Sequence, residues 1–186
     1  MMRKNFGPQT WLYPAPVLII AAYDENGVAN AMNAAWGGIY DSNKVCLCIS
    51  AGHKTTQNIR LKEAFTVSFA TVDTITACDY VGLESGTKVP NKLEKAGWHT
   101  VKSELVDAPV IQELPMTLEC KLEKINEDGI VIGQIVNVSA DEQVLDENGT
   151  IDPAKLQPVC FDGIHGTYQK LGEVVAKAFS VGAALK

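Results

Sequence analysis

Residues 50–59, Ser-Ala-Gly-His-Lys-Thr-Thr-Gln-Asn-Ile, bring a cation, hydroxyl groups and amides together directly after an apolar run. Thr55 or Thr56 suits the N-cap of a short helix, because a hydroxyl there accepts a hydrogen bond from a free backbone N–H. The start of a helix attracts anions, since its N–H groups are unpaired and its dipole is positive. Lys54 adds a full charge and Ser50 a hydroxyl, so the segment suits a phosphate monoester. An ordinary capped helix with a surface lysine explains the same residues.

A second group of residues that could bind a ligand is Asn30–Gly38, Asn-Ala-Met-Asn-Ala-Ala-Trp-Gly-Gly. The carboxamides of Asn30 and Asn33 each offer a donor and an acceptor, which the alternating N–H and C=O edge of an aromatic heterocycle needs. Met32 or Trp36 would supply flat apolar contacts. A loop whose methionine and tryptophan simply fill the core is an equal alternative.

These segments need strands and tight turns to position them. Asp24–Gly27 and Asn126–Gly129 each separate two apolar, β-branched runs, which is typical of hairpins. Many strands with few helices predict a mostly β chain folded as a small antiparallel barrel. The predicted strands are Val17–Tyr23, Val28–Met32, Val45–Ile49, Phe65–Ala70, Met116–Ile125 and Ile130–Val138, and the predicted helices are Thr56–Ala64, Asn91–Ala96 and Leu171–Phe179.

Length and composition indicate one ordinary domain over residues 1–186. Apolar residues make up 46% and charged residues 20% of the chain, as in soluble globular proteins. The net charge of −6 argues against a nucleic-acid surface, which needs clustered Lys and Arg. The apolar run Val17–Ala22 is too short for an export signal or a membrane span. We therefore expect a cytoplasmic protein with neither nucleic acid nor membrane as a partner.

The cysteines and histidines form no metal or disulfide pattern. Five cysteines at scattered positions give no disulfide framework. Cys46 and Cys48 share one face of a strand, and a buried structural role is favoured over a metal pair. Cys78 could be a redox thiol and His165 could approach a cofactor, although structural roles are favoured for both. No Gly-x-Gly-x-x-Gly opens a helix after a strand, which argues against a Rossmann fold.

Asn30–Trp36, followed by His53–Ile59, resembles the flavin reductase-like, FMN-binding split-barrel family, and most closely its flavoredoxin-type members. The resemblance continues through Cys78–Trp98 and Phe161–Glu173, so it covers nearly the whole chain. It implies a six-stranded split β-barrel, a homodimer, and FMN at or near the subunit interface.

The resemblance also implies the binding residues, position by position. The first motif matches the loop that lines the flavin ring and ribityl chain, and the second matches the phosphate-side segment. Because Ala51 and Gly52 stand between Ser50 and His53, the phosphate donors could shift by one residue, which makes Thr56 a reserve for Thr55. The residues implied are Asn30, Met32, Asn33, Ala34, Ala35 and Trp36 on the ring side, Ser50, His53, Lys54, Thr55 and Asn58 on the phosphate side, and Tyr168 near the flavin.

The resemblance implies an oxidoreductase in which NADH or NADPH reduces bound FMN, and the electrons pass to free flavin, a ferric complex or another acceptor. FMN carries this chemistry, so no protein nucleophile or carboxylate pair is required, and no catalytic residue is assigned. A flavoredoxin-like electron carrier, reduced by a protein partner and with little NAD(P)H activity, is the alternative. A barrel that stores FMN without turnover is a third. The sequence does not separate NADH from NADPH.

Overall fold

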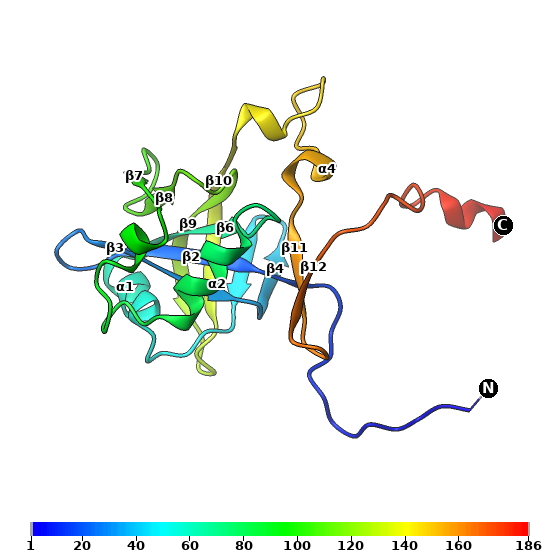
Figure 1. The fold of residues 1–186 in the computed structure, drawn as a ribbon, viewed down its shortest axis with the longest axis horizontal. Helices are drawn as coiled ribbons and strands as arrows, with labels where there is room; N and C mark the ends of the chain where they lie inside the picture. Colours follow the sequence, from blue (N-terminus) through cyan, green and yellow to red (C-terminus); the bar gives the residue numbers. More distant parts are fainter. Residues whose placement is uncertain (1, 186) are drawn as a thin grey trace.

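A curled antiparallel sheet of seven strands forms the centre of the computed structural model, which describes residues 2–185 (Figure 1). β3 and β4 are the two edge strands, although only Ala35 and Trp36 separate them in the chain. The predicted mostly β antiparallel barrel is therefore confirmed, with seven strands in place of the six expected. In order across the sheet, the strands are β3 (Ala29–Ala34), β2 (Leu18–Tyr23), β6 (Ala64–Phe69), β9 (Met116–Ile125), β10 (Val131–Ala140), β5 (Lys44–Leu47) and β4 (Gly37–Asp41).

β2 shows how the sheet is buried on both faces. Its Leu18 and Ile20 pack in one core cluster with Phe65 of β6, and its Ile19 and Ala21 pack in a second cluster on the opposite face. When the side chains on both faces of a strand are buried, its sequence is an unbroken apolar run, as it is in β2.

Short helices cover the two opposite faces of the sheet near β3. α1 (Lys54–Lys62) contributes Ile59 to the first core cluster, and α2 (Ile75–Leu83) contributes Cys78 and Val81 to the second. None of the described helices is long and apolar enough to cross a membrane. The remaining elements are α3 (Lys92–Lys95), α4 (Pro153–Leu156), the paired strands β7 (Thr100–Lys102) and β8 (Pro109–Ile111), and the 3-10 turns at Glu142–Val144 and Val181–Leu185.

The β11–β12 hairpin stands beside the main sheet and holds the N-terminal arm. β11 (Val159–Asp162) pairs with β12 (Thr167–Lys170) and with β1 (Ala15–Pro16). Asp162 is buried and accepts hydrogen bonds from the Tyr13 hydroxyl and, at 2.7 Å, from His165 Nδ1. These bonds hold the pKa of Asp162 well below its usual range. In Figure 1 the N-terminal arm and the C-terminal tail both extend away from the sheet on the side of this hairpin.

The predicted hairpin at Asp24–Gly27 is confirmed, since it joins the antiparallel strands β2 and β3. Asp24 Oδ1 accepts the N–H groups of Asn26 at 3.0 Å and Val28 at 2.9 Å. Gly27 has φ +76°, a conformation that side chains disfavour. Local turn chemistry of this kind is readable in the sequence because it involves only four or five consecutive residues.

Four expectations about the elements are wrong. Leu171–Phe179 is not helical: this segment is exposed, so no packed face stabilises a helix there. The predicted strand Val28–Met32 is confirmed as β3 but continues to Ala34, and Gly37 and Gly38 begin β4, where a loop was expected. α2 was not predicted, because its apolar residues Ile75, Ala77, Cys78 and Val81 are few and lie among small or β-branched ones. The N-cap of α1 is His53, without a side-chain hydrogen bond, and neither Thr55 nor Thr56.

Candidate functional site

Three adjoining cavities follow the free edge of β3. As an edge strand, β3 pairs only with β2, so alternate backbone N–H and C=O groups point away from the sheet. A polar cavity of about 270 Å³ and a middle cavity of about 260 Å³ share Asn33, Gly82 and Leu83. The middle cavity and an apolar cavity of about 700 Å³ share Ala35 and Phe161. The three cavities therefore lie in a row from α1 to the N-terminal arm, each sharing a wall with the next.

The polar cavity gathers much of the predicted phosphate side. It lies where the first turn of α1 meets the last turn of α2 and the loop that follows α2. Its position is that expected for anion binding, because no side chain within the described chain caps the first turn of α1. The cavity is lined by Asn30, Met32, Asn33, Gly52, His53, Lys54, Thr55, Val81, Gly82, Leu83, Glu84, Ser85, Gly86 and Lys92.

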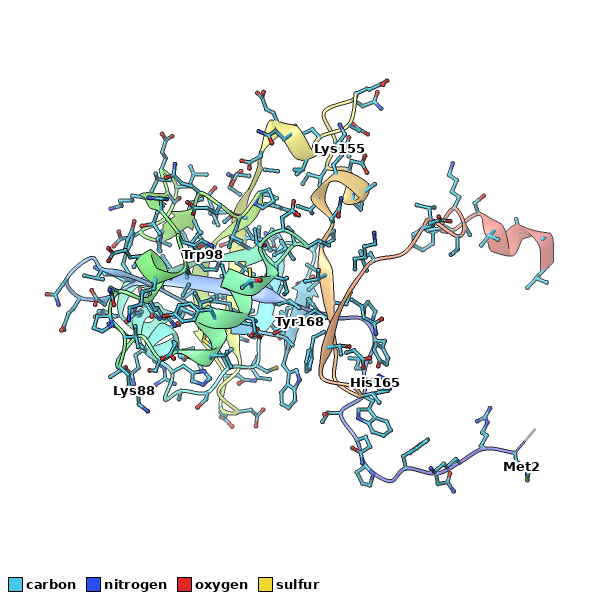
Figure 2. All side chains as sticks on the ribbon, in the orientation of Figure 1. Met2, Lys88, Trp98, Lys155, His165 and Tyr168 are labelled. Atoms are coloured by element: carbon cyan, nitrogen blue, oxygen red, sulfur yellow. The ribbon has the colours of Figure 1, made fainter. Side chains whose placement is uncertain are left out.

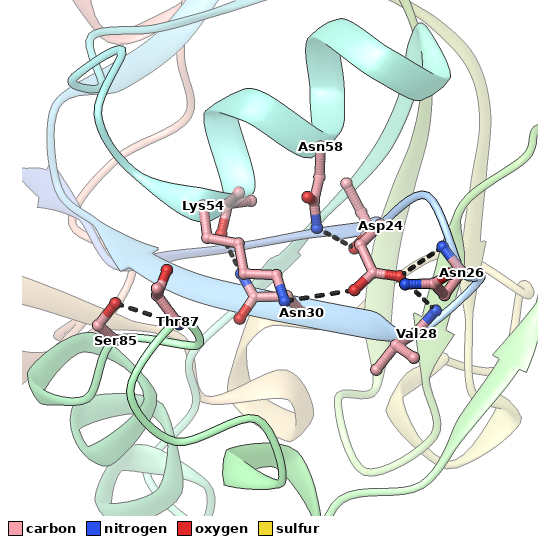
Figure 3. A network of polar contacts seen from close by, with 10 residues as sticks. Asp24, Asn26, Val28, Asn30, Lys54, Asn58, Ser85 and Thr87 are labelled. Carbon is pink, nitrogen blue, oxygen red and sulfur yellow. Dashed lines mark hydrogen bonds and ion pairs between the residues drawn. The ribbon is translucent and has the colours of Figure 1, made fainter.

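Lys54, the first residue of α1, forms an ion pair with the β2–β3 turn. Its Nζ lies 3.3 Å from Asp24 Oδ2 (Figure 3). Burial raises the pKa of Asp24, but hydrogen bonds from the Val28 N–H, Lys54 and the Asn26 N–H outweigh it and leave that pKa below its ordinary value. An ammonium has three donors, so Lys54 can contact Asp24 and a bound anion at the same time.

Asn30 and Thr55 connect β3 to α1 in the interior of the site. Asn30 Nδ2 donates to Thr55 Oγ1 at 2.6 Å, and both side chains are buried (Figure 3). The loop after α2 closes over this pair at Gly86, where a Cβ would lie 1.9 Å from Asn30 Oδ1. A glycine is therefore required at position 86 for the loop to approach so closely. The predicted residues Asn30 and Thr55 thus occupy one fixed unit of the cavity wall.

Lys92 is a second cation in the polar cavity, and nothing in the sequence distinguishes it from the neighbouring lysines. It is only 2% exposed, and its Nζ donates to the carbonyl oxygens of Val81 at 3.0 Å and Glu84 at 2.8 Å. Burial, reinforced by the charge of Lys54 and opposed by Glu84, lowers the pKa of Lys92 to about 8. Its ammonium stabilises the C-terminus of α2, where carbonyl groups are otherwise unpaired.

Asn33 and Tyr168 meet at the middle cavity. Asn33 Nδ2 donates to the Cys78 carbonyl of α2 at 3.2 Å. Tyr168, which Figure 2 places on the hairpin beside the sheet, donates its hydroxyl to Asp79 Oδ1 at 2.6 Å. Burial and the bond to Asp79 raise the pKa of Tyr168 to about 12, so the hydroxyl stays protonated at neutral pH. Asp79 was not predicted, because its partner lies 89 residues away in the chain.

The apolar cavity contains the exposed end of the ring-side motif. Trp36 is 59% exposed, so the alternative that it fills the core is wrong. Cys46 and Cys48 line the same cavity, which confirms that they share one face; however, Cys48 is exposed, contrary to the expected buried role. Across from them lie Trp11 and Leu12 of the N-terminal arm.

Several predicted residues lie outside the cavities. Asn58 is buried and donates to the Ala22 carbonyl at 3.3 Å, which fastens α1 to β2. Ser50 is exposed in the loop before α1, and Ala34 packs against the core. The hydroxyl of the reserve candidate Thr56 donates to the Ser50 carbonyl at 2.8 Å. This last bond holds the loop that precedes the helix.

Cys78 and His165 have different surroundings. Cys78 is fully buried in α2, and burial raises the pKa of its thiol to about 11, which makes a thiolate at neutral pH rare. His165 lies at the tip of the hairpin, bonded to Asp162 and outside the three cavities (Figure 2). Within the described residues, no group of three or more His, Cys, Asp or Glu side chains could hold a metal ion.

The structure is thus a half-open antiparallel barrel with cavities along one edge, which carry lysines at one end and apolar side chains at the other. The chain belongs to the flavin reductase like domain family, whose sequence profile matches residues 11–161.

Solved structures agree with this assignment. The fold is similar to the flavoredoxin of Desulfovibrio vulgaris (Miyazaki F), with a TM-score of 0.94 and 36% identity, over 97% of this chain and 100% of that one. It is also similar to a flavoredoxin from Methanosarcina acetivorans, with a TM-score of 0.90 and 26% identity over the whole of both chains. An FMN-binding domain of a flavin reductases-like enzyme from Shewanella baltica OS155 shares the fold, at a TM-score of 0.76 and 23% identity over 88% of this chain and 89% of that one. Because the first two matches cover nearly the whole chain, they include most of the extended C-terminal tail as well as the sheet.

Proposed function

We propose that this protein binds FMN along the edge of β3 and transfers electrons through it, as an NAD(P)H-dependent flavin or ferric reductase. The observation that carries the proposal is the change along the three cavities from cationic to polar to apolar side chains. Lys54 and Lys92 stand at one end, Asn33 and Tyr168 in the middle, and Trp36 at the other end. FMN has the same order of groups, with a dianionic phosphate, a polar ribityl chain and a flat ring.

The residues of the polar cavity fit a phosphate group. Lys54 supplies one charge at the start of α1, and the first-turn N–H groups add donors without a side-chain cap. Lys92 supplies a second charge whose burial strengthens its electrostatic attraction to an anion. Thr55 and Asn30 hold each other in place, which keeps this wall rigid when a ligand enters.

The middle cavity would hold the ribityl chain and the polar edge of the ring next to it. FMN, when bound, supplies hydride acceptance and onward electron transfer, so the chain has to bind, orient and expose it. Asn33 can direct its carboxamide oxygen at a ring N–H, because its nitrogen is already bonded to the Cys78 carbonyl. Tyr168 is held by Asp79 and so presents a fixed aromatic wall.

A second candidate is a flavoredoxin-like electron carrier, reduced by a protein partner and with little NAD(P)H activity. It is supported by the likeness to two flavoredoxins at 36% and 26% identity over nearly the whole chain. Both candidates use the same FMN site and differ only in the source of the electrons.

Two measurements test these proposals. Titration of the FMN-free protein should give tighter binding of FMN than of riboflavin, and Lys54→Ala should weaken only FMN binding, by about 1.5–3 kcal/mol, the range for a hydrogen bond to a charged group. Equal affinities for the two flavins would contradict the phosphate assignment. Anaerobic stopped-flow mixing with NADH and NADPH then separates the candidates. Rapid bleaching of the flavin absorbance supports the reductase, whereas bleaching only by a reduced protein supports the carrier.

A further inference from the structure

Cys46 and Cys48 lie on the face of the sheet that points away from the core, at the wall of the apolar cavity. Cys46 belongs to β5, and Cys48 follows that strand by one residue. Residues two apart on a strand point to the same face, and both cysteines line the cavity. Cys46 is half-buried and Cys48 is exposed, whereas Val45 and Leu47 are buried in the core. The two thiols are therefore accessible from the cavity, and neither fills the core.

The neighbouring edge strand β4 leaves the space beside these thiols open. Cys46 pairs with Gly38 across the two strands, and a Cβ at Gly38 would meet no atom within 4 Å. In the next pair along the strands, the Cys48 N–H donates to the Trp36 carbonyl at 2.8 Å. Trp36 is exposed and lines the same cavity. A small ligand therefore has open space next to Cys46 and an indole next to Cys48.

The spacing of the two cysteines does not suit a disulfide between them. A strand rises about 3.3–3.4 Å per residue, so side chains two residues apart begin about 6.7 Å from each other. A disulfide needs its Cβ atoms about 3.5–4.5 Å apart, and β5 is held between β4 and β10, which opposes the necessary bend. Metal–thiolate bonds of about 2.3 Å, as in zinc sites, would put the sulfurs of a linear complex about 4.6 Å apart. Two side chains that lean toward each other can span this distance without a change in the backbone.

The surroundings of the two thiols select the charge of the cation. Burial, with a further contribution from the charge of Cys46, raises the pKa of the Cys48 thiol, so this cavity wall disfavours a charged sulfur. Two thiolates carry two negative charges, which a divalent cation neutralises and a monovalent cation does not. Zinc needs four ligands, and no group of three or more His, Cys, Asp or Glu side chains among the described residues could supply them. A soft divalent cation that binds only two thiolates meets both conditions, and mercuric ion has this chemistry.

We propose that Cys46 and Cys48 form a binding site for mercuric ion, which is held linearly between their two sulfurs at the wall of the apolar cavity. Two S–H bonds break, two S–Hg bonds form and two protons pass to the solvent, and no oxidant or reductant takes part. The product has no net charge, so an apolar wall can accommodate it. Because both thiols are fixed on one strand, the second sulfur binds at a high effective concentration and the pair outcompetes single thiols. This site does not depend on the proposed flavin chemistry.

Competition with a monothiol tests the pair. The reduced full chain is mixed with one equivalent of mercuric chloride and a tenfold excess of 2-mercaptoethanol, and the mass of the protein is measured. The wild type should gain one mercury and lose two protons. In Cys46→Ser and in Cys48→Ser, the fraction that holds mercury without an attached monothiol should fall at least tenfold. Cys160→Ser is the matched control, because Cys160 is half-buried like Cys46 but does not line the cavity, and it should behave as the wild type. Full retention by either single variant, loss in the control, or two chains that share one mercury would overturn the proposal.

X-ray absorption at the mercury edge tests the geometry on the wild type, and therefore does not require a serine variant to fold. The adduct of the full chain should show two sulfur neighbours at one distance and no nitrogen or oxygen neighbour. One sulfur neighbour, or three or more, would contradict a cation held linearly between Cys46 and Cys48.

Discussion

Lys92 should give the protein two pH dependences of opposite sign, and Lys92→Met should remove both. Burial lowers the pKa of Lys92 from 10.5 to about 8. Between these values the unfolded chain binds more protons than the folded one, so stability without ligand should rise as pH increases through this window. At neutral pH the charged, buried lysine costs about 3 kcal/mol, which is 2.5 pKa units at 1.36 kcal/mol each.

The affinity for FMN should depend on pH with the opposite sign to the stability of the ligand-free protein. An anion beside Lys92 favours the ammonium form and raises its pKa, so FMN binding takes up a proton above pH 8. The affinity for FMN should therefore fall by up to about tenfold per pH unit above pH 8. Riboflavin has the same ring without the phosphate, so its affinity should not follow this trend.

The assay is a fluorescence titration of both flavins at pH 7.0 to 9.5, together with urea unfolding of the FMN-free protein over the same range. Lys95→Met is the matched control, because Lys95 lies on the same short helix but is exposed. If Lys92→Met kept the FMN-specific slope of the wild type, or if Lys95→Met removed it, Lys92 would have no part in holding the phosphate.

Four further variants test the cavities along β3. Asn33→Ala should lower FMN affinity by about 1–3 kcal/mol in a folded protein. Trp36→Ala should leave the melting temperature without cofactor nearly unchanged, because this tryptophan is exposed. Unfolding of the tryptophan variant would show that it belongs to the core. Gly86→Ala should weaken FMN binding at least tenfold by displacing the buried carboxamide against the loop, as judged by titration, and unaltered affinity would disprove that contact. Asp24→Asn keeps the side-chain oxygen that accepts the turn N–H groups but removes the charge that pairs with Lys54. FMN should therefore bind about 0.5–1 kcal/mol tighter, because its phosphate no longer competes with a carboxylate for Lys54. Weaker binding would mean that Asp24 is needed to hold Lys54 in position.

Local patterns were readable from the sequence, and contacts between distant segments were not. The hairpin at Asp24–Gly27 depends on consecutive residues, so its composition predicts it. Lys92 lies between Lys88 and Lys95, and nothing in the sequence distinguishes the one that is buried. Its environment arises only when the end of α2 and α3 meet in the folded chain.

The C-terminal tail shows that a local pattern alone does not establish a helix. Residues 171–179 have a sound helical pattern, yet a pattern stabilises a helix only where its apolar face is buried. Among the residues that the structure describes, nothing buries that face, and residues 171–179 form no helix. Periodicity in a sequence therefore reports a face that must be covered, whether the cover comes from the same chain or from another.

Asp24 couples the β2–β3 turn to Lys54 of the polar cavity, which joins folding to binding. One of its carboxylate oxygens accepts the N–H groups that shape the β2–β3 turn, and the other pairs with Lys54 on α1. The turn that sets the register of β3 also fixes the position of the first charge of the site. Because Asn30 on β3 is bonded to Thr55 on α1, a one-residue slip of that strand would break this bond and move the carboxamide to the other face of the sheet. The register of β3 therefore determines whether the cationic end and the ring-side residues lie on one path.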